Sequence, residues 1–287
     1  MTKRVGFIGL GNIGLPMARN LCGGAFEVTV HDVRPEAAEP LVELGATAAA
    51  SCGELAQGSE VVGICVRDDA DTEQAMLAED GVLAGARPDS IVVIHSTIRP
   101  GTVRAIAAAA AERGVHVLDA PITGGAAGAA GRRLCTMVGG DAALIDRCRD
   151  FLEASASRIV HAGGLGCGAV AKLCNNLMQY QVFQAGYEAA LLAREAGIAH
   201  EALEAVTRAN GLLSDSTGLF LKMRMVADER RGDAGLQATL SSFTSLAEKD
   251  LTLALELARE VGVALPGAGL CQQQMARVYG VDDTRRR

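Results

Sequence analysis

The strongest constraint on this chain is a glycine pattern, Gly9-x-Gly11-x-x-Gly14, which directly follows the apolar run from Val5 to Ile8. In a strand–turn–helix unit the first glycine allows a tight turn, and the second lets the backbone approach a pyrophosphate. The third allows the helix to pack closely on the sheet. The N–H groups at the start of that helix then face the phosphates. The pattern predicts a dinucleotide-binding unit at the start of the chain, in preference to a glycine-rich turn that binds nothing.

A second strand is expected at residues 27–32, and it ends at Asp32. This position follows the glycines by roughly 20 residues, where a carboxylate can accept hydrogen bonds from the ribose hydroxyls. A carboxylate there repels a 2′-phosphate and favours NAD. Arg34 lies two residues further on, and an arginine at that place can accept the 2′-phosphate, so NADP stays open.

The rest of the chain falls into two patterns. Short apolar runs at 61–66, 91–94, 115–118, 134–138 and 158–160 alternate with helical stretches, one of them at 35–44, which is typical of a parallel, doubly wound sheet. From Gly168 to Ala196 apolar residues recur at helical spacing without a proline. The remainder is helical throughout, with helices expected at 200–209, 217–226, 246–261 and 269–279. We therefore predict an α/β fold with a Rossmann-like domain at 1–163, a long interdomain helix at 164–196 and an all-α C-terminal domain at 197–287.

Charge and composition exclude several classes of protein. A net charge of −7 gives no electrostatic reason to expect nucleic acid or an anionic membrane surface. The eight cysteines form no C-x-x-C pair and no zinc-ligand spacing with the five histidines, so we expect no metal site. We expect the cysteines to be free thiols in a reducing cytoplasm. No apolar stretch reaches the roughly 18 uninterrupted residues of a membrane span.

Three polar residues are expected on one face of the long helix. Lys172, Asn175 and Asn176 are spaced i, i+3 and i+4 in an otherwise apolar stretch. A desolvated lysine near a helix N-terminus has a lowered pKa and can exchange a proton near neutral pH. The residues alone leave open that Lys172 extends to solvent instead.

A further glycine-rich segment runs from Asp119 to Gly125, directly after the expected strand at 115–118. The N–H groups of Thr123, Gly124 and Gly125 could cradle a carboxylate beyond the carboxyl ends of the strands. Taken alone, such a segment is more often only a turn.

Together and in this order, these motifs resemble the β-hydroxyacid dehydrogenase family over nearly the whole chain. The matching segments are 6–17, Ser96-Thr97 with Pro100, 119–125, the Lys172/Asn176 helix, and Phe243 with 249–251. The resemblance implies an NAD(P)-dependent oxidoreductase that interconverts a small 3-hydroxy acid and its semialdehyde or keto form, and a homodimer or homotetramer.

The resemblance also implies roles for individual residues. Lys172 would be the catalytic acid/base, and Thr123, Gly124, Gly125 and Asn176 would hold the carboxylate and hydroxyl of the substrate. The residues implied to contact the cofactor are Gly9, Gly11, Asn12, Ile13, Gly14, Asp32, Val66, Arg67, Thr97 and Lys249.

Two positions depart from the family pattern. Thr123 stands where serine is usual, and Arg67 stands where proline is common and could meet either a cofactor phosphate or solvent. The alternatives are an imine reductase-like enzyme, in which the lysine is replaced, a 6-phosphogluconate dehydrogenase, whose helical domain is much longer, and a non-catalytic nucleotide-binding protein. Lys172 argues against the first and the last. Which hydroxy acid is used stays open.

Overall fold

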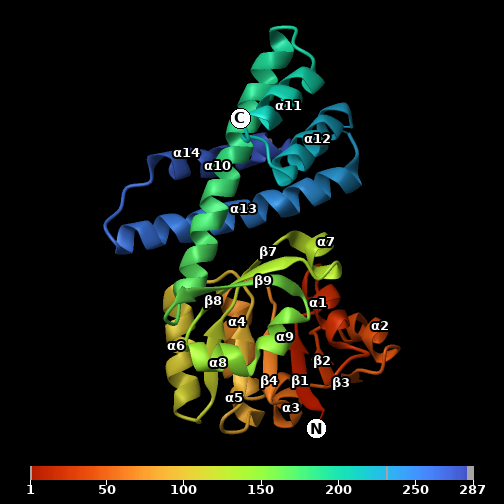
Figure 1. Ribbon diagram of the computed structural model, residues 1–287, viewed down its shortest axis with the longest axis vertical. Helices are drawn as coiled ribbons and strands as arrows, with labels where there is room; N and C mark the ends of the chain where they lie inside the picture. The colour runs from red at the N-terminus through yellow and green to blue at the C-terminus, as the bar shows by residue number, and fades with distance from the viewer. Residues whose placement is uncertain (1, 231, 283–287) are drawn as a thin grey trace. The chain divides into compact units, whose positions relative to one another are not determined.

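The computed structural model describes residues 2–230 and 232–282 and divides the chain into two compact units (Figure 1). The first unit ends at Lys172 and the second begins at Leu173. The last part of the expected C-terminal domain, residues 283–287, lies outside the described residues.

The first unit is built on one sheet. In chain order its strands are β1 (Lys3–Ile8), β2 (Phe26–His31), β3 (Thr47–Ala48), β4 (Val61–Ile64), β5 (Ile91–Ile94), β6 (His116–Asp119), β7 (Ile122–Thr123), β8 (Leu134–Gly139) and β9 (Ala156–Gly163). The order β3-β2-β1-β4-β5-β6 is parallel throughout, as predicted for a doubly wound fold. Beyond β6 the sheet becomes mixed, because β8 runs antiparallel to β6 and β7, while β9 is parallel to β8.

The central strands bury side chains on both faces, because successive residues of a strand point to opposite sides. One core contains Val5, Phe7, Val61, Ile91 and Val93. The other contains Ile8, Val62, Ile64, Val92 and Ile94. Because both faces of β1 from Val5 onward, of β4 and of β5 are buried, these stretches are continuously apolar in sequence and do not alternate between apolar and polar residues.

Helices connect these strands: α1 (Gly14–Leu21), α3 (Cys52–Gly58), α4 (Asp69–Leu77), α5 (Val82–Gly85), α6 (Pro100–Ala111), α7 (Gly125–Ala130), α8 (Ala142–Arg147) and α9 (Arg149–Glu153). The helix expected at 35–44 is instead a 3₁₀ turn, η1 (Pro35–Ala38), followed by the short α2 (Glu39–Val42). Pro40 lacks the N–H that would continue a regular helix through this stretch.

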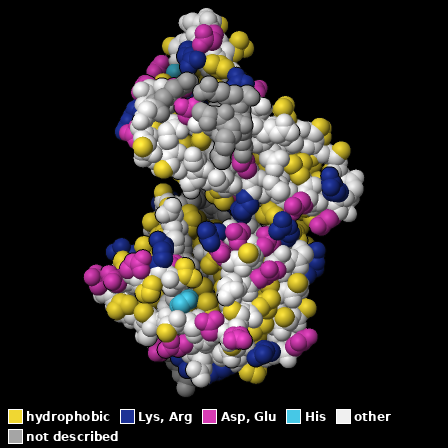
Figure 2. All heavy atoms as spheres, turned by 180° about the vertical axis from the view of Figure 1, so that it is seen from behind, with side chains coloured by type: hydrophobic (Ala, Val, Ile, Leu, Met, Phe, Trp, Pro, Cys, Tyr) yellow, Lys and Arg dark blue, Asp and Glu magenta, His cyan; other side chains and the backbone are white. Residues whose placement is uncertain are grey.

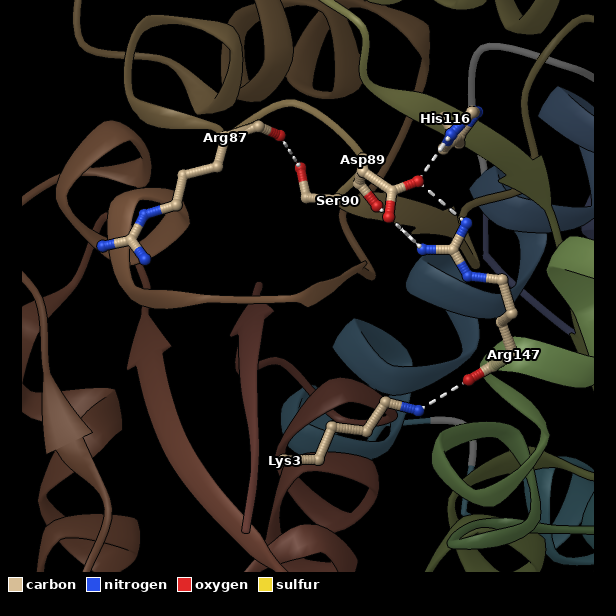
Figure 3. A network of polar contacts seen from close by, with 6 residues as sticks. All are labelled: Lys3, Arg87, Asp89, Ser90, His116 and Arg147. Atoms are coloured by element: carbon tan, nitrogen blue, oxygen red, sulfur yellow. Dashed lines mark hydrogen bonds and ion pairs between the residues drawn. The ribbon is translucent and has the colours of Figure 1, made fainter. Parts of the chain in front are cut away.

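A polar network fastens the amino-terminal ends of several strands (Figure 3). The Arg147 guanidinium donates to both carboxylate oxygens of Asp89 at 3.0 and 2.9 Å, and His116 Nε2 lies 3.2 Å from Asp89 Oδ1. Lys3 Nζ donates to the Arg147 carbonyl at 2.7 Å. Asp89 has a φ of 70°, so its three side-chain and main-chain contacts with Arg147 hold a turn in the left-handed region.

The second unit contains most of α10 (Cys167–Glu195), then α11 (His200–Ala209), α12 (Asp215–Glu229), α13 (Ala234–Glu260) and α14 (Pro266–Tyr279). Phe183 stacks on Phe220 with ring centroids 4.3 Å apart, and Tyr279 packs edge-on against both rings. α10 differs by one residue at each end from the stretch of helical spacing at 168–196, and it begins three residues after position 164, where the interdomain helix was expected to start. α13 begins well before the predicted Leu246, because Asp233 accepts a hydrogen bond from Leu236 N–H and so caps a polar first segment.

On the face drawn in Figure 2, acidic and basic side chains are interspersed rather than gathered by sign. No helix among the described residues combines the length and apolar character needed to span a membrane. In the same part of the chain, no group of three or more His, Cys, Asp or Glu side chains is arranged to hold a metal ion.

Candidate active site

A cavity of about 680 Å³ opens beyond the carboxyl ends of β1, β2 and β4. The strand order reverses between β1 and β4, which is the place where a doubly wound sheet binds its ligand. The sequence-predicted residues that line this cavity are Gly9, Gly11, Asn12, Ile13, Gly14, Asp32, Val66 and Arg67. The structure therefore brings most of the predicted cofactor residues together.

The three glycines each show the geometry that the pattern predicts. Gly9 has a φ of 90°, and a Cβ there would collide with the Cys65 carbonyl oxygen. A Cβ on Gly14 would collide with the Gly9 carbonyl oxygen, so the start of α1 packs directly on the turn. A Cβ on Gly11 would meet nothing within 4 Å. Gly11 therefore faces open space, as expected of a residue over which a pyrophosphate lies.

The Asp32 carboxylate is fixed by main-chain donors. Leu10 N–H donates to Asp32 Oδ2 at 2.7 Å, and Arg34 N–H donates to Oδ1 at 2.9 Å. The Arg34 guanidinium is 61% exposed and lies 3.4 Å from Oδ1. Because a carboxylate offers about four lone-pair directions, Asp32 keeps acceptor capacity for a ribose hydroxyl.

The opposite wall of the cavity follows β4. Val66 N–H donates to Ser96 Oγ at 2.9 Å, which connects the ends of β4 and β5. Arg67 forms two hydrogen bonds with Asp71, at 2.6 and 3.0 Å, and its side chain is 84% exposed. Thr97 follows β5 and is half-buried; in the described part of the chain it does not line this cavity.

The predicted carboxylate loop has the backbone that its glycines suggest. Thr123 ends β7, and the next two residues have positive φ, 125° at Gly124 and 64° at Gly125. Both glycines are exposed, and Gly125 starts α7. The loop thus lies at the surface of the first unit, with two consecutive glycines in a backbone conformation that side chains rarely adopt.

Asp119 joins this loop to the start of α10, a role that the sequence analysis did not assign. Its carboxylate, 1% exposed at the end of β6, accepts hydrogen bonds from Gly166 N–H and Ala169 N–H, each at 2.7 Å. Burial raises the pKa of Asp119, and the surrounding N–H donors oppose that rise. The carboxylate therefore fixes the helix N-terminus from which Lys172 projects one turn later.

Asn176 lies four residues after Lys172 on α10 and belongs to a buried cluster in the second unit. Its Nδ2 donates to Asp250 Oδ2 at 2.6 Å, and Tyr180 OH donates to the same oxygen at 3.1 Å. Lys249 Nζ lies 3.1 Å from Asp250 Oδ1, and Asp250 is 2% exposed. Burial and this neighbouring carboxylate both raise the pKa of Tyr180.

This cluster includes two functional candidates that the sequence reasoning missed, Asp250 and Tyr180. The available signal was an acid between Lys249 and Leu251 inside a helix with apolar periodicity, since a buried charge needs a partner. Lys249, expected to contact the cofactor, is placed with Asn176 and Asp250 in the second unit.

Comparison with known proteins gives two domain matches. Residues 4–164 match a family described as the NAD binding domain of 6-phosphogluconate dehydrogenase. Residues 166–284 match one described as the NAD-binding domain of NADP-dependent 3-hydroxyisobutyrate dehydrogenase.

Whole proteins are also similar. An uncharacterized oxidoreductase of Mycobacterium tuberculosis is 39% identical over 98% of this chain and 94% of that protein. A 3-hydroxyisobutyrate dehydrogenase of Pseudomonas aeruginosa is 35% identical over 93% of this chain and 89% of its own length. The solved structure of a Mycobacterium tuberculosis 3-hydroxyisobutyrate dehydrogenase with L-serine has a TM-score of 0.81 at 30% identity, covering 96% of this chain and 94% of that one. The solved structure of an imine reductase from a Pseudomonas species shares the fold. It has a TM-score of 0.66 at 20% identity, covering 98% of this chain and 96% of that one.

Proposed function

The chain belongs to the β-hydroxyacid dehydrogenase family, and from that premise we propose that it transfers hydride between a nicotinamide dinucleotide and a small 3-hydroxy acid. One arrangement carries the proposal. A dinucleotide-sized cavity forms over Gly11, and α10, fixed at its N-terminus by Asp119, carries Lys172 and Asn176 one turn apart.

The residues of the cavity fit the cofactor, because Gly11 leaves room for a pyrophosphate and Asp32 retains acceptors for ribose hydroxyls. The bound cofactor supplies the hydride acceptor or donor. Neutral Lys172 accepts the hydroxyl proton in the direction of oxidation, and its ammonium returns a proton in the direction of reduction. The N–H groups of Thr123, Gly124 and Gly125 hold the substrate carboxylate, and Asn176 orients the substrate hydroxyl.

We propose NAD as the preferred cofactor. The Asp32 carboxylate is held at the cavity wall by Leu10 N–H, so a 2′-phosphate would meet a fixed negative charge. An arginine at the place of Arg34 can accept a 2′-phosphate, but the Arg34 guanidinium is already paired with Asp32 at 3.4 Å.

The test is an assay at 340 nm with both cofactors against small 3-hydroxy acids, semialdehydes and cyclic imines. Wild type is expected to oxidise at least one hydroxy acid with NAD. Lys172→Ala should lower kcat by about 10²–10⁴-fold, the usual worth of a positioned acid/base. Lys222→Ala, which removes an exposed lysine of α12, is the matched control and should retain wild-type turnover.

Near-normal turnover of Lys172→Ala would refute the assignment of the acid/base. Binding of NAD without turnover of any substrate would favour the non-catalytic alternative, and turnover of imines alone would favour the imine reductase-like one.

We further propose a homo-oligomer that works in the cytoplasm. α11 buries no residue within the described chain, and Leu192, Val206, Leu212 and Leu219 of the second unit are 59–72% exposed, which suits a surface covered by another copy. All eight cysteines are free thiols, as in reducing compartments. Sedimentation as a monomer at micromolar concentration would contradict the oligomer.

A further inference from the structure

The face of α10 that carries position 172 is also the face turned toward the carboxylate of Asp119. A Cβ added to Gly168 would lie 2.9 Å from Asp119 Oδ2, so the face of α10 at Gly168 is turned toward this carboxylate. Lys172 is four residues further on, which places it on that face with its Cβ about 6 Å along the helix. Helical side chains lean toward the N-terminus, so the lysine stem extends back toward Asp119.

Space for this carboxylate is built into the fold. A Cβ on Gly139 would collide with Asp119 Oδ1, and one on Gly168 would collide with the Met137 carbonyl oxygen. Both oxygens of Asp119 accept main-chain N–H bonds of 2.7 Å, a length typical of charge-assisted hydrogen bonds. The positive end of the α10 dipole is therefore occupied by a fixed anion.

From this arrangement we propose that Asp119 is a positioning residue that favours the ammonium form of Lys172 and so confines oxidation of the hydroxy acid to alkaline pH. The inference rests on the proposed function of Lys172. The positive end of the α10 dipole by itself favours the neutral form of the lysine. With the carboxylate in place, a negative charge one helical turn before the lysine more than offsets that effect.

Other titratable groups surround the junction. They are Arg104 of α6, close to Gly166; His161 of β9, which contacts the carbonyls of Gly140 and Gly163; and Cys167 at the start of α10. His95, which follows β5, contacts the carbonyl of Ala120. All of them remain in an Asp119 variant, so a change in pH dependence reports the lost carboxylate.

The test is the pH profile of kcat for oxidation in wild type, Asp119→Asn and Asp141→Asn. Asparagine keeps the size of Asp119 and one acceptor oxygen but removes the charge. The limb set by Lys172 should move about one pH unit toward acid in Asp119→Asn. Asp141→Asn is the matched control, because Asp141 also caps a helix and accepts a hydrogen bond from Ala143 N–H at 2.8 Å. The limb of the pH profile that Lys172 sets should not move in this variant.

An unmoved limb in folded Asp119→Asn, or equal movement in both variants, would overturn the proposal. If wild type oxidises no hydroxy acid, the proposed function fails, but the proposal about Asp119 can still be tested. An NMR pH titration of ¹³C-labelled lysine then measures the protonation of Lys172 directly. The Lys172 signal is the one that disappears in Lys172→Arg. If Asp119→Asn does not fold, the same titration of wild type decides: a midpoint above the ordinary value for lysine, about 10.4, supports the proposal, and one at or below it overturns the proposal.

Discussion

Protonation of one buried histidine should account for a measurable part of the acid sensitivity of this protein. His95 is 4% exposed, its ring packs against those of Phe7 and Phe151 with centroids 6.1 and 6.2 Å away, and its Nδ1 lies 2.8 Å from the Ala120 carbonyl oxygen. Its Nε2 is buried with no hydrogen-bond partner in the described part of the chain. Burial lowers the pKa of His95 from 6.5 to about 4, because an imidazolium there would lack solvation.

The sign of the effect follows from proton counts. Between pH 6.5 and about 4 the unfolded chain binds a proton at His95 and the native protein does not, so acid favours unfolding in this window. At about 1.4 kcal/mol for each pH unit, the gap amounts to about 3 kcal/mol. The contribution is complete above pH 6.5 and is lost as the pH falls to about 4.

Urea unfolding of wild type and His95→Asn from pH 7.5 to 4 measures this directly. Asparagine can still donate to the Ala120 carbonyl but cannot take up the proton, so its unfolding free energy should fall less steeply across the window, by about 3 kcal/mol in total. The lost ring lowers the stability of the variant at every pH and leaves the slope comparison intact. His31→Asn is the control, because His31 Nδ1 also contacts a carbonyl, that of Ala49 at 3.0 Å, on a half-exposed ring. Parallel curves for wild type and His95→Asn would refute the reasoning.

Substitutions of two glycines, Gly11 and Gly14, should separate an effect on cofactor binding from an effect on folding. Gly11→Ala has room for its methyl group, so it should keep the wild-type melting temperature but bind NAD at least tenfold more weakly in titration calorimetry. Gly14→Ala should have a lower melting temperature, because its methyl group collides with the Gly9 carbonyl. Equal melting temperatures for the two variants would contradict this. Asp250→Ala leaves the amide of Asn176 and the hydroxyl of Tyr180 without their acceptor and should cost about 3–5 kcal/mol of unfolding free energy, whereas Tyr180→Phe should cost about 1 kcal/mol in the same urea titration. A smaller loss for Asp250→Ala than for Tyr180→Phe would count against the cluster.

The features that the sequence predicts well are those fixed by short stretches of chain. The Gly9–Gly14 turn is a local steric requirement, and the parallel strands through β6 follow from short apolar runs separated by helices. α10 was predictable because helical spacing persists over its whole length. The antiparallel β8 was not, because strand direction depends on pairing across the sheet, and the extra first segment of α13 has too few apolar residues to show a period.

The residues that fix the candidate site were harder to find, because their partners are distant in sequence. Asp119 bonds Gly166, 47 residues away, and Asp250 bonds Asn176, 74 residues away. Each acid lies within a segment that the sequence had already singled out, Asp119 in 119–125 and Asp250 in 249–251, but neither was assigned a role. An isolated acid next to apolar residues predicts a buried partner without saying which.

The carboxylates of Asp119 and Asp250 each hold a different part of α10. Asp119 holds the N-terminus of the helix within the first unit, one turn before Lys172, and Asp250 holds the amide of Asn176 within the second. The helix itself keeps Lys172 and Asn176 one turn apart. Loss of Asp119 should therefore change the proton chemistry of Lys172 while leaving Asn176 in place, and loss of Asp250 should release Asn176 while leaving the pH limb of Lys172 unmoved. Because the two anchors lie in different units, the two effects are expected to be additive in a double variant.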